Sequence, residues 1–234
     1  MTRVAVFGAR GRMGTLVCEA VEASADLVLA ARCDRPGPHD LGNAEVVVDF
    51  SLPAGTAELL PLLGTRALVT GTTGLSDELQ AALEAQATRS AVVQAGNFST
   101  GVNVLLGLLS TAAAALPDYD IEIVEMHHRN KVDAPSGTAM ALAGAVQGAR
   151  GGELVHGREG HTGVREHGPI GMHALRGGDV AGEHLVYLAG PGERLQLGHL
   201  ATGRHVFVEG ALRAARWATG RSAGLYRMAD VLGL

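Results

Sequence analysis

Short apolar stretches alternate with helix-length stretches over residues 1–100, and this alternation constrains the fold more than any other feature of the sequence. Two of the apolar stretches, Val46 to Val48 and Ala91 to Val93, are continuous runs without polar residues between them. Strands that are covered by helices on both faces have this character. Strand and helix in alternation therefore predict an α/β fold with a Rossmann-like, doubly wound parallel sheet.

The individual elements follow from apolar runs, turn residues and helix caps. The expected strands are Val4 to Phe7, Leu27 to Cys33, Glu45 to Phe50, Ala67 to Thr70 and Ala91 to Ala95. The expected helices between them are Met13 to Ala23, Ala54 to Leu63 and Asp77 to Thr88. Ser76 is suited to cap the last of these helices, whose first turn is acidic.

The character of the chain changes near residue 100, because histidine occurs once before residue 127 and nine times from His127 to His205. The later elements are helices at Val102 to Leu116 and Thr138 to Ala149, an alternating strand at Asp120 to Met126, and strands at Ile170 to Arg176, Gly182 to Ala189 and Arg194 to Leu200. Glycine-rich turns separate the last three strands, which predicts a second α+β domain on a mostly antiparallel sheet. We expect a dinucleotide-binding domain at residues 1–98, completed by residues 206–234, and a substrate-binding and oligomerisation domain at residues 99–205.

Composition excludes several classes of protein. With 47% hydrophobic and 18% charged residues, the 234-residue chain is neither disordered nor fibrous. Its net charge of -5 supplies no basic field for nucleic acid or a membrane surface. The apolar stretch from Val102 to Leu116 is too short to span a bilayer, and the first residues lack the pattern of a signal peptide. Two cysteines make no disulfide framework, so we expect a cytoplasmic protein.

Three glycines, Gly8, Gly11 and Gly14, follow the first strand and open the first helix. Glycines there let the backbone approach a pyrophosphate, whose charge is attracted by the N–H groups at the helix start. Asp34 ends the second strand, where a carboxylate accepts hydrogen bonds from an adenosine ribose. We therefore predict a dinucleotide site, the alternative being a doubly wound domain whose glycines serve only packing.

The cofactor preference stays open at this stage. Asp34 favours NADH, whereas Arg12 and Arg35 could reach a ribose 2′-phosphate and favour NADPH. Two later loops, Gly71-Thr72-Thr73-Gly74 and Ala95-Gly96-Asn97-Phe98, follow the fourth and fifth strands. Ligands of open α/β sheets bind at these strand ends, and hydroxyls, a carboxamide and an aromatic ring suit a nicotinamide and its ribose. Ordinary connecting loops are the alternative.

The densest polar cluster extends from Glu125 to Thr138 and contains two histidines, an arginine and Lys131, the single lysine of the sequence. It ends where Pro135-Ser136-Gly137-Thr138 leads into a helix, whose first N–H groups lack intrahelical partners and can bind a carboxylate. Histidine and lysine also transfer protons, which hydride addition to a double bond requires. We predict a small substrate with one or more carboxylates, the alternative being surface cations beside a core histidine.

A metal site is not expected in this cluster. His127 and His128 are adjacent, so their side chains point apart in an extended chain, and no further His or Cys spacing supports them. Lys131 is of more interest, because an arginine does not release its proton usefully whereas a lysine can.

The stretch His127-His128-Arg129-Asn130-Lys131-Val132-Asp133-Ala134-Pro135-Ser136-Gly137-Thr138-Ala139 closely resembles the signature of the 4-hydroxy-tetrahydrodipicolinate reductase family, also called dihydrodipicolinate reductases, of bacterial diaminopimelate and lysine synthesis. The resemblance spans nearly the whole chain. Other segments that look like the family are Gly8 to Gly14, Asp49-Phe50-Ser51, Gly71 to Gly74, Asn97-Phe98-Ser99, Gly101-Val102-Asn103 and Arg158 to Gly163.

The resemblance implies His127 as a proton donor or acceptor, Lys131 as a proton donor and His128 as a substrate contact, while Gly137 and Thr138 hold a substrate carboxylate. It implies reduction of a cyclic imine dicarboxylate, with protonation by Lys131 or His127 and loss of the 4-hydroxyl as water. A homotetramer assembled through the second sheet and a hinge near Phe98 to Gly101 are also implied. With Arg35 added from the charge argument, the expected NADH or NADPH contacts are Gly8, Ala9, Arg10, Gly11, Arg12, Met13, Asp34, Gly71, Thr72, Thr73, Ala95, Gly96, Asn97 and Phe98.

Two departures from the family pattern concern the adenosine side of the cofactor: the segment from Arg35 to Glu45 is short, and Arg10 adds a cation to the glycine loop. One alternative function is another two-domain NAD(P)H reductase or dehydrogenase of a small carboxylate. A semialdehyde dehydrogenase is disfavoured, because Cys18 and Cys33 both precede the expected position of its nucleophile. A nucleotide-sensing regulator without catalysis would need a basic DNA-contacting helix, and the second domain is net acidic.

Overall fold

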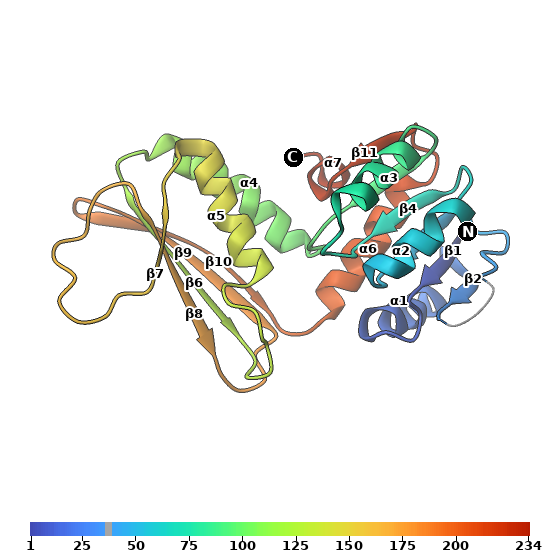
Figure 1. The fold of residues 1–234 in the computed structure, drawn as a ribbon, viewed down its shortest axis with the longest axis horizontal. Helices are drawn as coiled ribbons and strands as arrows, with labels where there is room; N and C mark the ends of the chain where they lie inside the picture. Colours follow the sequence, from blue (N-terminus) through green and yellow to red (C-terminus); the bar gives the residue numbers. More distant parts are fainter. Residues whose placement is uncertain (36–38) are drawn as a thin grey trace. The chain divides into compact units, whose positions relative to one another are not determined.

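The computed structural model describes residues 1–35 and 39–234, which divide into two compact units. The first unit comprises Met1–Thr100 and Arg204–Leu234, and the second comprises Gly101–Gly203 (Figure 1). The short segment from Arg35 to Glu45 that departs from the family pattern includes residues 36–38, which lie outside the described residues. Within the described ranges, no helix is long and apolar enough to cross a membrane.

The first unit is built on a parallel sheet of six described strands in the order β11-β5-β4-β3-β1-β2. These strands are β1 (Thr2–Phe7), β2 (Leu27–Cys33), β3 (Val46–Asp49), β4 (Ala67–Thr70), β5 (Ala91–Gln94) and β11 (Gly224–Tyr226). The chain passes from β1 outward to β2 and then returns to the other side of β1, so the strand order reverses between β1 and β3. The predicted Rossmann-like sheet is confirmed, and its ligand-binding crevice is expected at this reversal.

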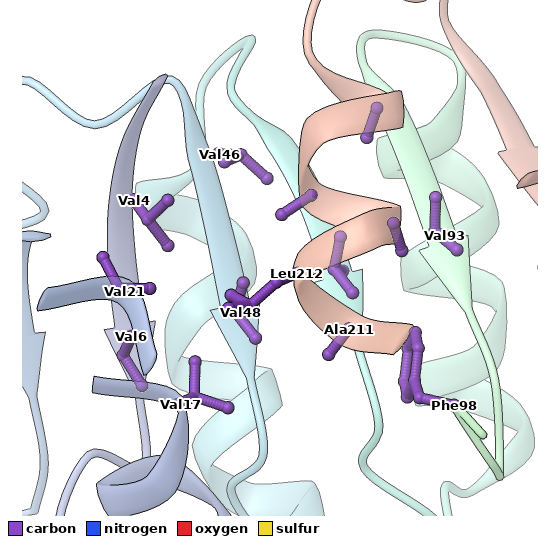
Figure 2. Packing of buried hydrophobic residues seen from close by; sticks show 14 of the residues in the cluster. Val4, Val6, Val17, Val21, Val46, Val48, Val93, Phe98, Ala211 and Leu212 are labelled. Carbon is purple, nitrogen blue, oxygen red and sulfur yellow. The ribbon is translucent and has the colours of Figure 1, made fainter. Parts of the chain in front are cut away.

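Helices cover both faces of this sheet, which explains the continuous apolar character of its strands. The helices are α1 (Arg12–Ala23), α2 (Pro53–Leu59), the 3-10 helix η1 (Leu60–Leu62), α3 (Asp77–Ala87), α6 (His205–Ala218) and α7 (Met228–Leu232). In Figure 2, Val17 of α1 and Leu212 of α6 pack against the same face of the sheet as Val48. Each fully buried valine or leucine of this kind contributes about 1.5–3 kcal/mol to stability.

The C-terminal segment belongs to the first unit. Its helix α6 packs in the same core as Val93 and Phe98, and β11 then pairs in parallel with β5 at the sheet edge, Leu225 opposite Val92. The sequence predicts a helix from about Val206 to Ala218, which agrees with α6, but it does not predict β11, because a three-residue strand has too few positions to show a periodic pattern.

The second unit is a five-stranded sheet in the order β10-β9-β6-β8-β7 with two helices, α4 (Thr100–Ala115) and α5 (Gly137–Arg150). The strands are β6 (Asp120–His127), β7 (Leu154–His156), β8 (Ile170–Arg176), β9 (Gly182–Gly190) and β10 (Glu193–Ala201). Leu109 of α4 and Leu142 of α5 pack against Ile121 and Ile123 on one face of the sheet.

This sheet is mixed: the expected antiparallel pairing joins β6, β9 and β10, and the sequence does not predict the parallel pairing of β7 and β8. β9 pairs antiparallel with β6 and β10, whereas β8 pairs in parallel with β6 and β7. The turn at Gly177 and Gly178 does not join neighbouring strands: it passes over the end of β6, where Gly177 donates its N–H to the carbonyl of His127. The sequence suggests a hairpin there, because two glycines indicate that the chain turns. They do not indicate which strand the next strand pairs with.

Candidate functional site

A crevice of about 630 Å³ lies at the reversal point of the first sheet. It is lined by residues that follow β1, β2, β3 and β4: Phe7, Gly8, Gly11, Arg12, Met13, Asp34, Arg35, Phe50, Ser51, Leu52, Pro53, Gly55, Gly71 and Thr73. Most of the predicted cofactor contacts are thereby brought together at one sheet edge. This is where an open α/β sheet binds its ligand.

The glycine loop forms a cradle into which side chains would not fit. Gly8 adopts a φ of +79°, and a Cβ there would lie 2.9 Å from the carbonyl oxygen of Phe50. A Cβ on Gly14 would lie 2.0 Å from the carbonyl oxygen of Gly8, so α1 packs directly on the loop. Gly11 is the N-cap residue of α1 and supplies no capping side chain, which leaves the helix start open to an anion. These features fit a dinucleotide pyrophosphate.

Asp34 separates the crevice from a second hollow of about 910 Å³, which Ala9 and Arg10 also line. Its carboxylate accepts the backbone N–H of Arg10 at 2.5 Å and that of Arg35 at 2.8 Å, so it ties the end of β2 to the glycine loop. A carboxylate in this position suits ribose hydroxyls. The guanidinium of Arg35 is paired with Glu58, which also lies 3.4 Å from His39.

The loops after β4 and β5 place their side chains differently from one another. Thr73 lines the crevice, whereas Thr72 is buried and donates its hydroxyl to Asp49 at 3.1 Å. Ala95 hydrogen-bonds to the carbonyl of Thr70, and Gly96 lies near the methyl group of Thr73. Asn97 accepts the N–H of Ser99, and Phe98 is buried, with its ring 5.6 Å from that of Phe50. The ring of Phe98 therefore belongs to the core beneath the loop.

In the second unit, His127 is the last residue of β6 and is buried, with 8% of its surface exposed. Its Nδ1 lies 2.5 Å from Oε2 of Glu125, which is two residues earlier on the same strand face. A Cβ added to Gly182 would lie 3.0 Å from Nε2 of His127, so glycine is the residue that fits beside that nitrogen.

Glu125 is surrounded by hydrogen-bond donors. Arg176 donates to both carboxylate oxygens at 2.8 Å, and the backbone N–H of Ser136 donates to Oε1 at 3.0 Å. Burial by itself raises the pKa of this carboxyl, but the hydrogen bonds from Arg176, His127 and Ser136 outweigh it and leave the pKa of Glu125 below its ordinary value. Glu125 is thus ionised at neutral pH.

Lys131 lies on the loop between β6 and α5, with Nζ 2.8 Å from Oδ1 of Asp133. The hydrogen bond from Lys131 is the main cause that lowers the pKa of Asp133. The N–H of Lys131 donates to the carbonyl of His128, whose own N–H bonds to Val180. The predicted substrate contact His128 and the predicted proton donor Lys131 therefore share one hydrogen-bonded loop, which directly follows His127 at the end of β6.

The start of α5 is formed as the sequence predicts, with Ser136 as N-cap residue and Gly137 and Thr138 in the first turn. Oγ of Ser136 accepts the N–H of Ala139 and lies 3.1 Å from Nε2 of His184. The first N–H groups of a helix have no partner within the helix, so a helix start of this kind can bind a carboxylate.

Sequence reasoning missed Glu125, Arg176, His184 and Asp49 as site residues. For Glu125 a signal existed: β6 alternates, and Ile121, Ile123, Glu125 and His127 share its buried face. A charged residue on the apolar face of a strand needs a partner, which marks it as functional or structural. Arg176 and His184 offered no such signal, since their pairing depends on which strands lie side by side.

A doubly wound domain with a glycine-lined crevice, together with a domain that carries proton-transferring side chains beside an anion-binding helix start, defines a two-domain nucleotide-dependent oxidoreductase. The particular family follows from comparison with known proteins. Residues 2–98 match the model of dihydrodipicolinate reductase, N-terminus, and residues 101–232 match that of dihydrodipicolinate reductase, C-terminus. The chain belongs to the dihydrodipicolinate reductase family.

Individual relatives agree with the family models. The chain is 47% identical to 4-hydroxy-tetrahydrodipicolinate reductase of Caulobacter vibrioides, over 99% of this chain and 97% of that protein. It is 45% identical to the enzyme of the same name from Alkalilimnicola ehrlichii, over 100% and 99%. A dipicolinate-bound dihydrodipicolinate reductase from Paenisporosarcina sp. TG-14 superposes with a TM-score of 0.80 at 25% identity, covering 98% of both chains. The predicted family, its NAD(P)H-dependent reductase class and its role in lysine synthesis are confirmed.

Proposed function

We propose that this chain reduces 4-hydroxy-tetrahydrodipicolinate to tetrahydrodipicolinate with NADH or NADPH, and that the loop from His127 to Thr138 carries the proton chemistry and holds the substrate. One observation carries the residue assignment. Residues 127–138 place a buried histidine, the single lysine of the sequence and the start of α5 in one short segment, and Glu125 hydrogen-bonds to both His127 and the N-cap residue Ser136. Proton transfer and carboxylate binding are the two tasks that reduction of a cyclic imine dicarboxylate requires.

The cofactor would be held by the glycine loop, with its pyrophosphate at the start of α1 and its adenosine ribose at Asp34. Gly71 and Thr73 line the same crevice and would contact the nicotinamide side. When bound, the reduced nicotinamide supplies the hydride. Ala95, Gly96, Asn97 and Phe98 would contribute through their backbone and by packing beneath the loop.

The substrate would be held by one carboxylate at the start of α5, through the N–H groups of Gly137 and Thr138. His128 and Lys131 add positive or proton-donating groups near the same loop. A dicarboxylate ligand is consistent with the dipicolinate that the Paenisporosarcina relative binds.

His127 or Lys131 supplies the proton that balances the reaction. Substrate, NAD(P)H and one proton yield tetrahydrodipicolinate, NAD(P)⁺ and one water molecule, formed from the departing 4-hydroxyl. His127 keeps Nδ1 toward Glu125, which leaves Nε2 to exchange the proton. Lys131 is held by Asp133 and can donate through Nζ.

The test follows oxidation of NADH and NADPH with freshly prepared substrate. We expect the wild type to oxidise at least one cofactor, and Lys131→Ala to lose about 100-fold or more in kcat. Lys131→Arg is the matched variant, because it keeps the charge but not a readily released proton. If Lys131→Arg keeps the wild-type kcat, Lys131 acts only by binding the substrate through its charge. If the wild type oxidises neither NADH nor NADPH, the proposed function is refuted.

We also propose that the chain acts in the cytoplasm as a homotetramer assembled through the second sheet. The face of this sheet opposite α4 and α5 carries half-buried Val124 and Met126 of β6 and Leu185 and Tyr187 of β9. No helix packs on that face within the described residues, and apolar faces of this kind mark interfaces. Light scattering should give four times the 24.1 kDa chain mass, and Leu185→Glu should lower it. A monomeric wild type at micromolar concentration would contradict the proposal.

A further inference from the structure

The carboxylate of Glu125 is the most constrained charged group of the second unit. It is 1% exposed and takes part in four hydrogen bonds, with Arg176 on both oxygens, Ser136 on Oε1 and His127 on Oε2. A buried carboxylate costs several kcal/mol unless its charge and its oxygens are all satisfied, and here they are. The proton transfer described above does not need Glu125 to react, so its burial calls for another explanation.

The hydrogen-bond roles in this cluster fix the tautomer of His127. Arg176 and the backbone N–H of Ser136 can only donate, so Glu125 is an acceptor in every contact. Its Oε2 therefore accepts from Nδ1 of His127, which must carry a hydrogen. The other ring nitrogen, Nε2, makes no contact with Glu125 and lies beside Gly182, which has no side chain to cover it.

The same carboxylate joins the end of β6 to the start of α5. Oε2 holds the ring of His127, while Oε1 holds the backbone of Ser136, the N-cap residue of the helix that would bind the substrate carboxylate. Arg176 adds a third tie by donating to the carbonyl of Asp133 in the intervening loop at 2.6 Å. The ring and the helix start are thus held at a fixed separation by one side chain.

We propose that Glu125, charge-balanced by Arg176, is a positioning residue for the reduction: it locks His127 as the Nδ1–H tautomer with Nε2 directed at the substrate and sets its distance from the carboxylate-binding start of α5. This inference rests on the proposed role of His127. Glu125 acts through His127 and does not itself touch the substrate. Positioning of this kind matters because a displacement of about 1 Å at a reacting group can cost about 100-fold in rate.

The test compares Glu125→Gln with wild type in three measurements: kcat, KM for the substrate, and the ¹⁵N chemical shifts of the His127 ring at alkaline pH. The amide of glutamine presents one donor and one acceptor, so it cannot satisfy His127, Arg176 and Ser136 together. We expect kcat to fall by about 100-fold with a much smaller change in KM. The wild-type shifts should show hydrogen on Nδ1, and the variant should show a mixture of tautomers. Glu125→Asp, which keeps the charge, should restore the tautomer signature in part.

Two further variants separate a positioning role from loss of structure or of the underlying function. Ile123→Ala removes a buried side chain from the same face of the same strand, and we expect it to lower the melting temperature while leaving kcat within about twofold and the His127 shifts unchanged. Wild-type kcat in His127→Ala would refute the role of His127 and the present inference with it. If His127→Ala is inactive but Glu125→Gln keeps the wild-type kcat and the wild-type His127 tautomer, only the positioning role of Glu125 is refuted.

Discussion

The hydroxyl of Ser136 lies 3.1 Å from Nε2 of His184, and the same oxygen accepts the N–H of Ala139 at the start of α5. The buried ring of His184 thus touches the N-cap residue of that helix. Burial, reinforced by the neighbouring His127, lowers the pKa of His184 to about 4. Protonation of His184 would place a buried charge beside the N-cap residue of α5.

This contact predicts a loss of stability in mild acid. An unfolded histidine titrates near about pH 6.5, so between about pH 6.5 and about pH 4 the unfolded chain binds the extra proton and the free energy of unfolding falls as the pH falls. The contribution is fully present above this window and amounts to at most about 3 kcal/mol. Urea unfolding at about pH 7 and pH 5 should show a drop that is about 2 kcal/mol smaller in His184→Gln. An equal drop in the wild type and in His184→Gln would refute His184 as the source of the loss of stability.

Asp49 is predicted to support cofactor binding through the loops that it organises. This buried carboxylate accepts hydrogen bonds from the hydroxyls of Ser51, Thr56, Thr70 and Thr72 at 2.6 to 3.1 Å. Asp49→Asn replaces an acceptor by a donor against these hydroxyls, which should cost about 1–3 kcal/mol of stability and weaken NADH binding severalfold, as measured by fluorescence titration.

The matched control for Asp49 is Thr56→Val, which removes one hydroxyl from the same carboxylate at a residue that does not line the crevice. It should lower the melting temperature without changing the dissociation constant of NADH. Equal weakening of NADH binding in both variants would show that Asp49 acts only through general stability.

Gly14→Ala should disrupt the dinucleotide crevice. The added methyl group would lie 2.0 Å from the carbonyl oxygen of Gly8, so α1 must move away from the glycine loop. We expect loss of measurable NADH binding and destabilisation by several kcal/mol, about as large as an overpacked core allows. Gly148→Ala in α5 is the contrast, because its Cβ meets no atom within 4 Å, and it should stabilise by about 0.5–1 kcal/mol. Tight NADH binding by Gly14→Ala would contradict the inference that close packing of α1 on the glycine loop shapes the dinucleotide crevice.

Glu58 is predicted to limit the use of NADPH. It pairs with Arg35, one of the cations that could reach a ribose 2′-phosphate, and both side chains are partly exposed, so the pair itself contributes little to stability. Glu58→Gln should release Arg35 and raise the ratio of kcat/KM for NADPH over NADH by less than about tenfold, with little change in stability. Glu45→Gln, which breaks the exposed pair with Arg3, should leave the ratio unchanged. A falling ratio in Glu58→Gln would overturn the prediction.

The parts of the site that could be predicted from sequence are contiguous in the chain. Gly8 to Gly14 form a strand–turn–helix connection whose geometry depends on neighbouring residues, and Ser136 to Thr138 form a helix start that is set by the local sequence. Burial of the first sheet on both faces could also be predicted, because the sequence of each strand is a continuous apolar run. The parallel pairing of β7 and β8 in the second sheet could not be predicted, because strand neighbours are decided by long-range packing.

The sequence by itself determined the Rossmann-like sheet, the glycine loop and the loop from His127 to Thr138, since each depends on interactions over a few residues. Only the tertiary structure decided what surrounds His127. Parallel pairing of β6 with β8 sets His127 opposite Arg176, and antiparallel pairing with β9 sets Glu125 opposite His184. Those residues are far apart in the chain, and they meet because the apolar faces of β6, β8 and β9 are buried together in one register under α4 and α5.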